Sequence, residues 1–284
     1  MAYIEKEYKT PWGIEHVLYW EGNYGGKGEK REKRKKATPD QIRKQNQKNK
    51  ENRIRRIINA NFVAGDWWIT LKYPKGTRKS IEEVDADVNR FTRIMRERYK
   101  KLGIPFKWVK RIEIGRHGGI HVHMVINRAD DPKNDLSISD AWIRARRSTQ
   151  IEDLIDGYYP ADGMAHLDHV RTVGNGQELA EYIAKEQPSV LDDGTELTKA
   201  QLRRISHYGC SRNLIRPVPQ EKRYSHWTVR RILELGASGL NSTQNRYRTE
   251  GYIVDQESWV QGINPVTGLS YLHYFEVPAR RKRE

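Results

Sequence analysis

Cysteine and long apolar runs are scarce in this chain, and both shortages restrict what the protein can be. The single cysteine, Cys210, cannot close an intrachain disulfide or build a multi-cysteine zinc site. A membrane-spanning helix needs about 18 or more consecutive apolar residues, and no such run occurs. The sequence also does not open on the charged and then apolar segments of a secretion signal. We therefore expect a cytoplasmic protein without membrane spans.

Positive charge is what the chain has in excess, with a formal net charge of +15. Residues 27–56 hold fourteen Lys or Arg and four Asp or Glu, a net +10. Such a run is often only a solvated helix surface, but eight tryptophans and fifteen tyrosines accompany it, and cations with stacking aromatics favour a nucleic acid. The phosphate-binding loop Gly-x4-Gly-Lys-Ser/Thr is absent, so no nucleotide-driven motor is predicted. We predict DNA contacts, mostly to phosphate, from Lys33, Arg34, Lys35, Lys36, Arg53, Arg55, Arg56, Arg116, His117 and Arg144.

From residue 66 onward the pattern becomes that of a globular domain. β-rich runs bounded by turn residues predict strands at 67–73, 107–114, 120–127 and 165–173, and apolar stripes predict helices at 80–102, 138–147 and 177–187. The order β-α-β-β-α-β-α is that of a split βαβ, ferredoxin-like α+β sheet with helices on one face. We expect a basic N-terminal extension at 1–60, this core at 61–216, and a basic helix with a β-rich extension at 217–284.

Two histidines mark the second strand of the predicted hairpin. Side chains alternate between the faces of a strand, so His121 and His123 point the same way, roughly 6.7 Å apart along the strand. A three-residue loop at 117–119 would place Glu113 directly opposite His123 and on the same face. Two imidazoles and a carboxylate suit Mn²⁺, or Mg²⁺ where phosphate oxygens complete the shell. Iron oxygenases and cupins use the same ligand types, so the triad alone leaves the chemistry open.

The last helix of this region carries a candidate nucleophile. At 100° per residue, Tyr182, Lys185 and Glu186 fall within about 120° of one another. A helical tyrosine beside apolar residues is more often a packing residue, but a phenolate can attack a phosphodiester and form a linkage of similar energy to the one broken. Lys185 would neutralise developing charge, and Glu186 would assist the metal or the tyrosine proton. Tyr158 and Tyr159 are a weaker pair of nucleophile candidates.

These motifs together resemble those of the HUH endonucleases. His121-Val122-His123 followed by Tyr182-Ile183-Ala184-Lys185 is similar to the motifs of single-tyrosine rolling-circle replication initiators (Rep proteins) of plasmids, phages and related mobile elements. The strand at 68–73 looks like the first motif of that family, and Glu113 matches the carboxylate that several members use as third ligand. The histidine pair precedes the tyrosine, which favours an initiator over a relaxase, whereas HUH transposases share this order but are usually shorter.

The resemblance implies a metal-dependent enzyme that nicks and rejoins single-stranded DNA. It would stay attached to the 5′ phosphate through Tyr182, leave a 3′-hydroxyl for a polymerase, and act on origin duplex DNA opened by a separate helicase, because the chain lacks a helicase motif. The alternative from a different class is a non-catalytic RNA-recognition-motif (RRM)-like binding module, since that sheet has the same strand order. It would carry aromatic residues where this chain has the histidine pair.

Overall fold

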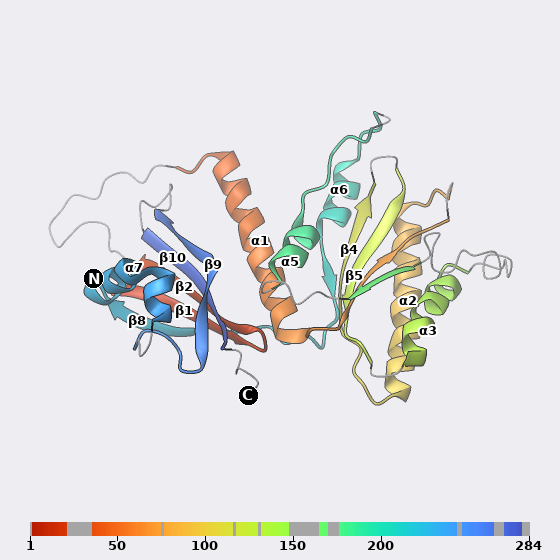
Figure 1. Ribbon diagram of the computed structural model, residues 1–284. Coiled ribbons are helices and arrows are strands. Elements are labelled where there is room, and N and C mark those ends of the chain that lie inside the picture. The colour runs from red at the N-terminus through yellow and green to blue at the C-terminus, as the bar shows by residue number, and fades with distance from the viewer. Residues whose placement is uncertain are drawn as a thin grey trace. The chain divides into compact units, whose positions relative to one another are not determined.

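The computed structural model divides the chain into two compact units (Figure 1). Unit 1 comprises Met1–Ala60 and Arg216–Glu284, and unit 2 comprises Asn61–Ile215. The structure describes residues 2–21, 36–74, 77–115, 118–129, 132–147, 165–169, 176–192, 194–242, 246–263 and 270–279. None of the helices in these ranges is both long and apolar enough to cross a membrane.

Unit 2 is built on an antiparallel sheet in the order β6-β3-β5-β4-β7. Its strands are β3 (Trp67–Leu71), β4 (Trp108–Ile114), β5 (Ile120–Ile126), β6 (Ala165–His169) and β7 (Gly209–Cys210). Its helices are α2 (Ile81–Lys101), α3 (Pro132–Ala145), α5 (Gln177–Ala184) and α6 (Lys199–Ser206). Strands and helices from β3 to α5 follow one another in the predicted order, and the unit is α+β.

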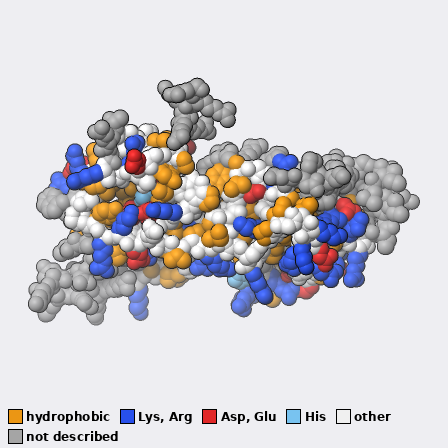
Figure 2. Space-filling view, turned by 90° about the horizontal axis from the view of Figure 1, so that it is seen from below, with side chains coloured by type: hydrophobic (Ala, Val, Ile, Leu, Met, Phe, Trp, Pro, Cys, Tyr) orange, Lys and Arg blue, Asp and Glu red, His pale blue; other side chains and the backbone are white. Residues whose placement is uncertain are grey.

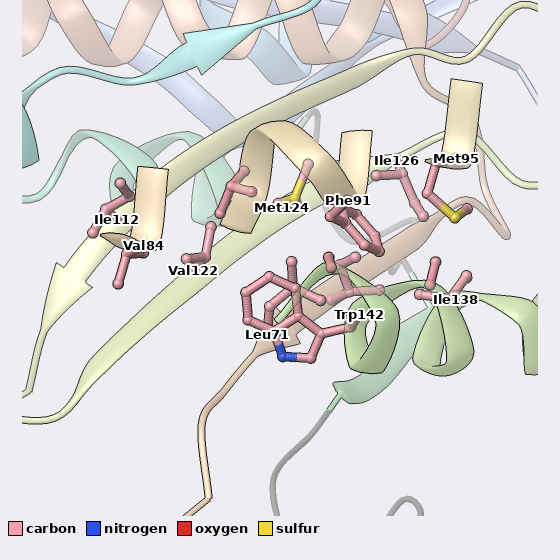
Figure 3. Packing of buried hydrophobic residues seen from close by; sticks show 14 of the residues in the cluster. Leu71, Val84, Phe91, Met95, Ile112, Val122, Met124, Ile126, Ile138 and Trp142 are labelled. Carbon is pink, nitrogen blue, oxygen red and sulfur yellow. The ribbon is translucent and has the colours of Figure 1, made fainter. Parts of the chain in front are cut away.

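The sequence signals around α2 explain why it forms where it does. Ser80 accepts a hydrogen bond from the Glu83 backbone N–H, and the Glu83 carboxylate accepts one from the Ser80 N–H, so the predicted capping box is present. The apolar stripe of α2 packs with α3 against one face of the sheet, where Val84, Phe91 and Trp142 are fully buried (Figure 3). Burial of each such large side chain stabilises the fold by roughly 1.5–3 kcal/mol.

Alternation along the strands leaves the opposite face of this sheet polar. On β3, the buried side chains of Trp67, Ile69 and Leu71 alternate with the half-buried Trp68 and Thr70. The helix α5 lies on this second side, away from α2 and α3 (Figure 1). The residues that alternate with the core are therefore available to a site between sheet and helix.

The register of the β4–β5 hairpin differs from the one predicted. Glu113 is the cross-strand partner of His121, not of His123, because Ile114 pairs with Ile120 and the connecting loop is longer than expected. A hydrogen bond of 2.7 Å from the Gly115 N–H to the Gly119 carbonyl closes that loop. A shift of two residues keeps every side chain on its face, so Glu113 still lies on the face of both histidines.

Unit 1 joins the two ends of the chain in a second antiparallel sheet, in the order β8-β1-β2-β10-β9. Its strands are β1 (Ala2–Thr10), β2 (Gly13–Glu21), β8 (Gln220–Ser225), β9 (Tyr252–Ile263) and β10 (Ser270–Pro278). The segments that the sequence divided into an N-terminal and a C-terminal extension thus share one sheet. Only long-range pairing, such as β1 with β8, reveals this, because no local pattern records which strands meet.

Helices lie on both faces of the sheet of unit 1. The helix α7 (His226–Asn241) covers an apolar cluster on one face, with Leu18, Val229 and Leu272 at its centre. The helix α1 (Pro39–Asn61) lies across the other face, and its first half extends beyond the sheet with exposed side chains. At the entrance and exit of unit 2, the Asn61 amide bonds both the N–H and the carbonyl of Ile215, each at 2.7 Å.

Candidate active site

Tyr182, His123 and Glu113 meet over the polar face of the sheet in unit 2. The Tyr182 hydroxyl lies 2.9 Å from Glu113 Oε2 and 3.0 Å from His123 Nε2. His123 Nε2 is itself 3.1 Å from Glu113 Oε2. Residues predicted separately as nucleophile and as metal ligands are thus in direct contact, although 59 positions separate His123 from Tyr182 along the chain.

Two residues of β3 set the orientation of His123. Thr70 Oγ1 lies 3.1 Å from its Nδ1, which leaves Nε2 to face Tyr182 and Glu113. The Trp68 ring stacks on the imidazole at a centroid distance of 5.6 Å and meets the Tyr182 ring edge-on at 5.5 Å. The sequence analysis assigned neither residue a role in the site. Their alternate positions on a strand next to the histidine strand were the available signal.

His121 lies farther from the nucleophile than His123 does. Its ring centroid is 6.4 Å from that of His123, and its Cα is the cross-strand partner of Glu113. The absence of a side chain at Gly115 makes room for it, because a Cβ there would lie 3.4 Å from His121 Cε1. Burial and the neighbouring His123 lower the pKa of His121 and favour the neutral imidazole, which is the form that binds metals.

The hydrogen bonds at the centre of the site separate the charges of Glu113 and Tyr182. The bond with His123, supported by the one from Tyr182, outweighs burial and lowers the pKa of Glu113 to about 2. Burial and the bond to Glu113 raise the pKa of Tyr182 to about 12. At neutral pH the carboxylate is therefore ionised, while the phenol keeps its proton and has two acceptors in reach.

The predicted metal ligands form a compatible donor set but not a closed coordination shell. In the part of the chain that the structure describes, no group of three or more His, Cys, Asp or Glu side chains is arranged to hold an ion. His123 and Glu113 are in contact and His121 shares their face, so two nitrogen donors and one carboxylate border the same space. This combination suits Mn²⁺, or Mg²⁺ together with phosphate oxygens.

The end of α5 corrects one expectation about Lys185 and Glu186. The helix ends at Ala184, and Lys185 is its C-cap with an extended ψ of 134°. Helical spacing therefore does not place these two exposed side chains beside Tyr182. In a longer helix, the Tyr182 carbonyl would accept the N–H of Glu186, but here it accepts a hydrogen bond from Arg111 of β4.

Arg55 and Arg56 are not the phosphate contacts that the sequence predicted. The Arg55 side chain is 2% exposed, and its guanidinium donates to Glu15 at 2.7 Å. Arg56 bonds both oxygens of Glu15, at 2.8 and 2.9 Å, and lies over the ring of Tyr8. Both arginines therefore hold α1 against the sheet of unit 1, because a buried carboxylate needs partners of opposite charge.

The other predicted DNA contacts have varied surroundings. Lys36 and Arg53 are exposed, and Arg144 is exposed beside its ion-pair partner Asp140. Lys33, Arg34, Lys35, Arg116 and His117 lie outside the described residues, as do Tyr158 and Tyr159. The face of the molecule in Figure 2 carries widely spread Lys and Arg side chains, in agreement with the net charge.

Comparison with known proteins finds one family. Residues 66–187 match a family model described as replication-associated protein ORF2. The matched segment covers somewhat under half of the chain and contains Glu113, His121, His123 and Tyr182. No curated protein and no solved structure matches the chain. The match supports a replication-associated protein and locates the similarity in the region that holds the candidate active site.

Proposed function

We propose that this chain, which resembles replication-associated proteins over residues 66–187, initiates rolling-circle replication as an HUH-type endonuclease. It would nick single-stranded DNA at a specific site in a metal-dependent reaction and later rejoin the strand. The observation that carries the proposal is the contact of the Tyr182 hydroxyl with both Glu113 and His123. A phenol beside acceptors for its proton, above a sheet face with two imidazoles, is the arrangement that phosphodiester transfer to tyrosine requires.

In the proposed reaction, the Tyr182 oxygen attacks the scissile phosphorus while the bond from phosphorus to the 3′ oxygen breaks. The phenolic proton passes to a group in contact with it, either Glu113 or His123, and the leaving oxygen takes up a proton to become a 3′-hydroxyl. The product is a 5′-phosphotyrosine, and attack by a 3′-hydroxyl reverses the step. A Mn²⁺ or Mg²⁺ ion held by Glu113, His121 and His123 would supply polarisation of the scissile phosphate.

Lys185 and Glu186 keep their proposed roles from positions just beyond α5. Lys185 follows Tyr182 by one helical turn and is exposed, so DNA can reach its ammonium group to neutralise charge at the phosphate. Glu186 would assist the metal or the tyrosine proton. The fold is compatible with these roles, because β5 lies between β3 and β4, with α2 as the crossover, as in a split βαβ core.

The proposed partners are single-stranded DNA, the origin duplex, a separate helicase and a polymerase, in the cytoplasm. The exposed first half of α1 supports the DNA contacts, since Lys36, Arg43, Lys44, Lys48 and Arg53 are accessible there. Phosphate contacts of this kind provide affinity without sequence preference.

The decisive experiment compares the wild type with Tyr182→Phe. Both proteins are incubated with single-stranded oligonucleotides from the neighbouring DNA in Mn²⁺ or EDTA, and covalent adducts are read on a denaturing protein gel. We expect an adduct only with Mn²⁺ and only for proteins that retain the Tyr182 hydroxyl. Tyr271→Phe is the matched control, because Tyr271 and Tyr182 are each 37% exposed.

The other outcomes are equally informative. An adduct that survives in Tyr182→Phe would assign the nucleophile to another tyrosine, with Tyr158 and Tyr159 as the first to test. Tight binding of every oligonucleotide without any adduct would favour the RRM-like binding module over the enzyme.

A further inference from the structure

The helix that carries Tyr182 has few attachments of its own. α5 has only eight residues, and helices shorter than about 12–15 residues are marginal in water. Its N-cap is Gly176, in the left-handed conformation at φ 67°, which has no side chain to bond the first N–H groups. The buried residues of α5 are Ala180, Ile183 and Ala184, two of them the smallest apolar side chains after glycine. Contacts from other elements must therefore decide where this helix lies.

Arg111 of β4 supplies such a contact at the end of the helix. Its side chain is 1% exposed, and its guanidinium donates to the backbone carbonyl of Tyr182. That carbonyl is one of the last four of α5, which have no N–H partner within the helix. Arg111 Nε also donates, at 3.3 Å, to the side-chain amide oxygen of Gln187, just beyond the helix.

The position of Arg111 on the sheet connects this contact to the reacting groups. Arg111 is the cross-strand partner of His123 and lies two residues before Glu113 on the same strand face. Its positive charge lies at the negative end of the helix dipole, which adds to the attraction. One guanidinium thus attaches the backbone of the nucleophile to the strand that carries the carboxylate beside it.

We infer that Arg111 is a positioning residue for Tyr182, an inference that rests on the proposed function. A side chain that is 1% exposed does not reach DNA, so Arg111 acts through the backbone of the nucleophile and not on the phosphate. The hydrogen bonds from Tyr182 to Glu113 and His123 fix only the tip of the phenol. Arg111 fixes the Cα from which that side chain extends.

Arg111→Met tests the inference, because it keeps a long side chain and removes the donors. A displacement of about 1 Å at reacting atoms lowers a rate by about 100-fold. We therefore expect the single-turnover rate constant of adduct formation, at saturating oligonucleotide and Mn²⁺, to fall about 100-fold. The Kd for the oligonucleotide should change by less than about threefold, because the lost contact acts on chemistry and not on binding. Arg111→Lys should recover part of the rate, since an ammonium can still donate to the Tyr182 carbonyl.

Lys110→Met is the matched control on the same strand. Lys110 points to the opposite face, where it pairs with Asp85 at 3.2 Å, so its loss should leave the adduct rate unchanged. Hydrogen exchange of residues 177–184 is measured in parallel on all variants. We expect protection there to fall at least tenfold in Arg111→Met and to remain in Lys110→Met, while protection of α2 is retained in both.

The two measurements separate failure of this inference from failure of the proposed function. A wild-type rate or wild-type protection of α5 in Arg111→Met would overturn the positioning role. Equal loss of protection in α2 and α5 would also overturn it, because Arg111 would then support the whole unit. If the wild type forms no adduct, the proposed enzyme fails, and hydrogen exchange still decides whether Arg111 holds the Tyr182 helix.

Discussion

Thr70 has no reactive role of its own, yet it sets which nitrogen of His123 faces the nucleophile. Its hydroxyl lies 3.1 Å from Nδ1, so Nε2 points to Tyr182 and Glu113. Partners of this kind orient ligating histidines in metal sites. The chemistry of His123 therefore depends on a neighbour that belongs to a different strand.

Thr70→Val should weaken the dependence of adduct formation on Mn²⁺. Valine has nearly the same shape but no hydroxyl, and loss of a partner of a metal-ligating histidine typically costs about 10- to 100-fold in metal affinity. A Mn²⁺ titration of the adduct rate measures this as a rise in half-saturating concentration. Thr92→Val is the control, because the Thr92 hydroxyl bonds only within α2, to the Asn89 carbonyl at 3.0 Å, and should leave the titration unchanged.

His16 predicts how the stability of unit 1 varies with pH. Its buried imidazole lies 2.7 Å from Glu5 and 3.3 Å from Glu276, stacked on the Tyr274 ring. Burial alone would lower the pKa of His16, but the bonds with Glu276 and Glu5 outweigh it and raise this pKa to about 9.

A folded-state pKa above the unfolded value near 6.5 means that His16 stabilises the fold fully below pH 6.5. That contribution is lost as pH rises through about 9. We expect the free energy of unfolding to fall by about 1–3 kcal/mol between pH 6.5 and 9, measured by urea denaturation. His16→Gln should remove most of this slope, and a slope as steep as that of the wild type would assign the effect to another group.

At the scale of the element, the turn between β1 and β2 depends on one glycine. Gly13 has a φ of +145°, which side chains with a Cβ rarely adopt. A Cβ there would lie 2.2 Å from the Glu276 carbonyl oxygen of β10, a backbone atom that cannot move aside. The hairpin and its pairing with β10 therefore both require glycine at this position.

Gly13→Ala should destabilise unit 1 by more than the roughly 1–3 kcal/mol of backbone strain, because the clash is added to it. Urea or thermal unfolding measures the change. Gly251→Ala is the control in the same unit, since Gly251 also has positive φ, at 80°, but nothing lies within 4 Å of its Cβ position. Equal losses in the two variants would show that φ alone matters and that the contact with Glu276 does not.

At the scale of the whole molecule, the net charge of +15 determines how nucleic acids bind. The exposed half of α1 concentrates cations, and its ion pairs, such as Lys44 with Asp40 at 3.0 Å, are solvent-exposed and weak. Those cations remain able to neutralise phosphates, in contrast to the buried Arg55.

Replacing Arg43, Lys44, Lys48 and Arg53 by Gln should flatten the salt dependence of DNA binding. Each phosphate contact contributes about 0.7 to the slope of log K against log salt concentration for single strands, so four lost contacts reduce it by up to about 3. Fluorescence anisotropy from 50 to 200 mM salt measures the slope. The control replaces four exposed cations of α2, Arg93, Arg96, Lys100 and Lys101, and should alter the slope less. Equal effects would mean that binding follows net charge and not the α1 surface.

Local patterns in the sequence determined much of unit 2. The order of strands and helices, the capping box of α2 and the shared face of His121 and His123 follow from propensity, capping and the two-residue period of strands. These features depend on residues close together in the chain, so they can be predicted without tertiary contacts.

Only the tertiary structure decided the remaining features. The pairing of Glu113 with His121, the end of α5 at Ala184 and the burial of Arg55 each depend on partners distant in sequence or on the loop between strands. The closure of one sheet by both ends of the chain is of the same kind. A hydrogen bond or ion pair between distant segments forms only when packing brings them together, and no local period records that partner.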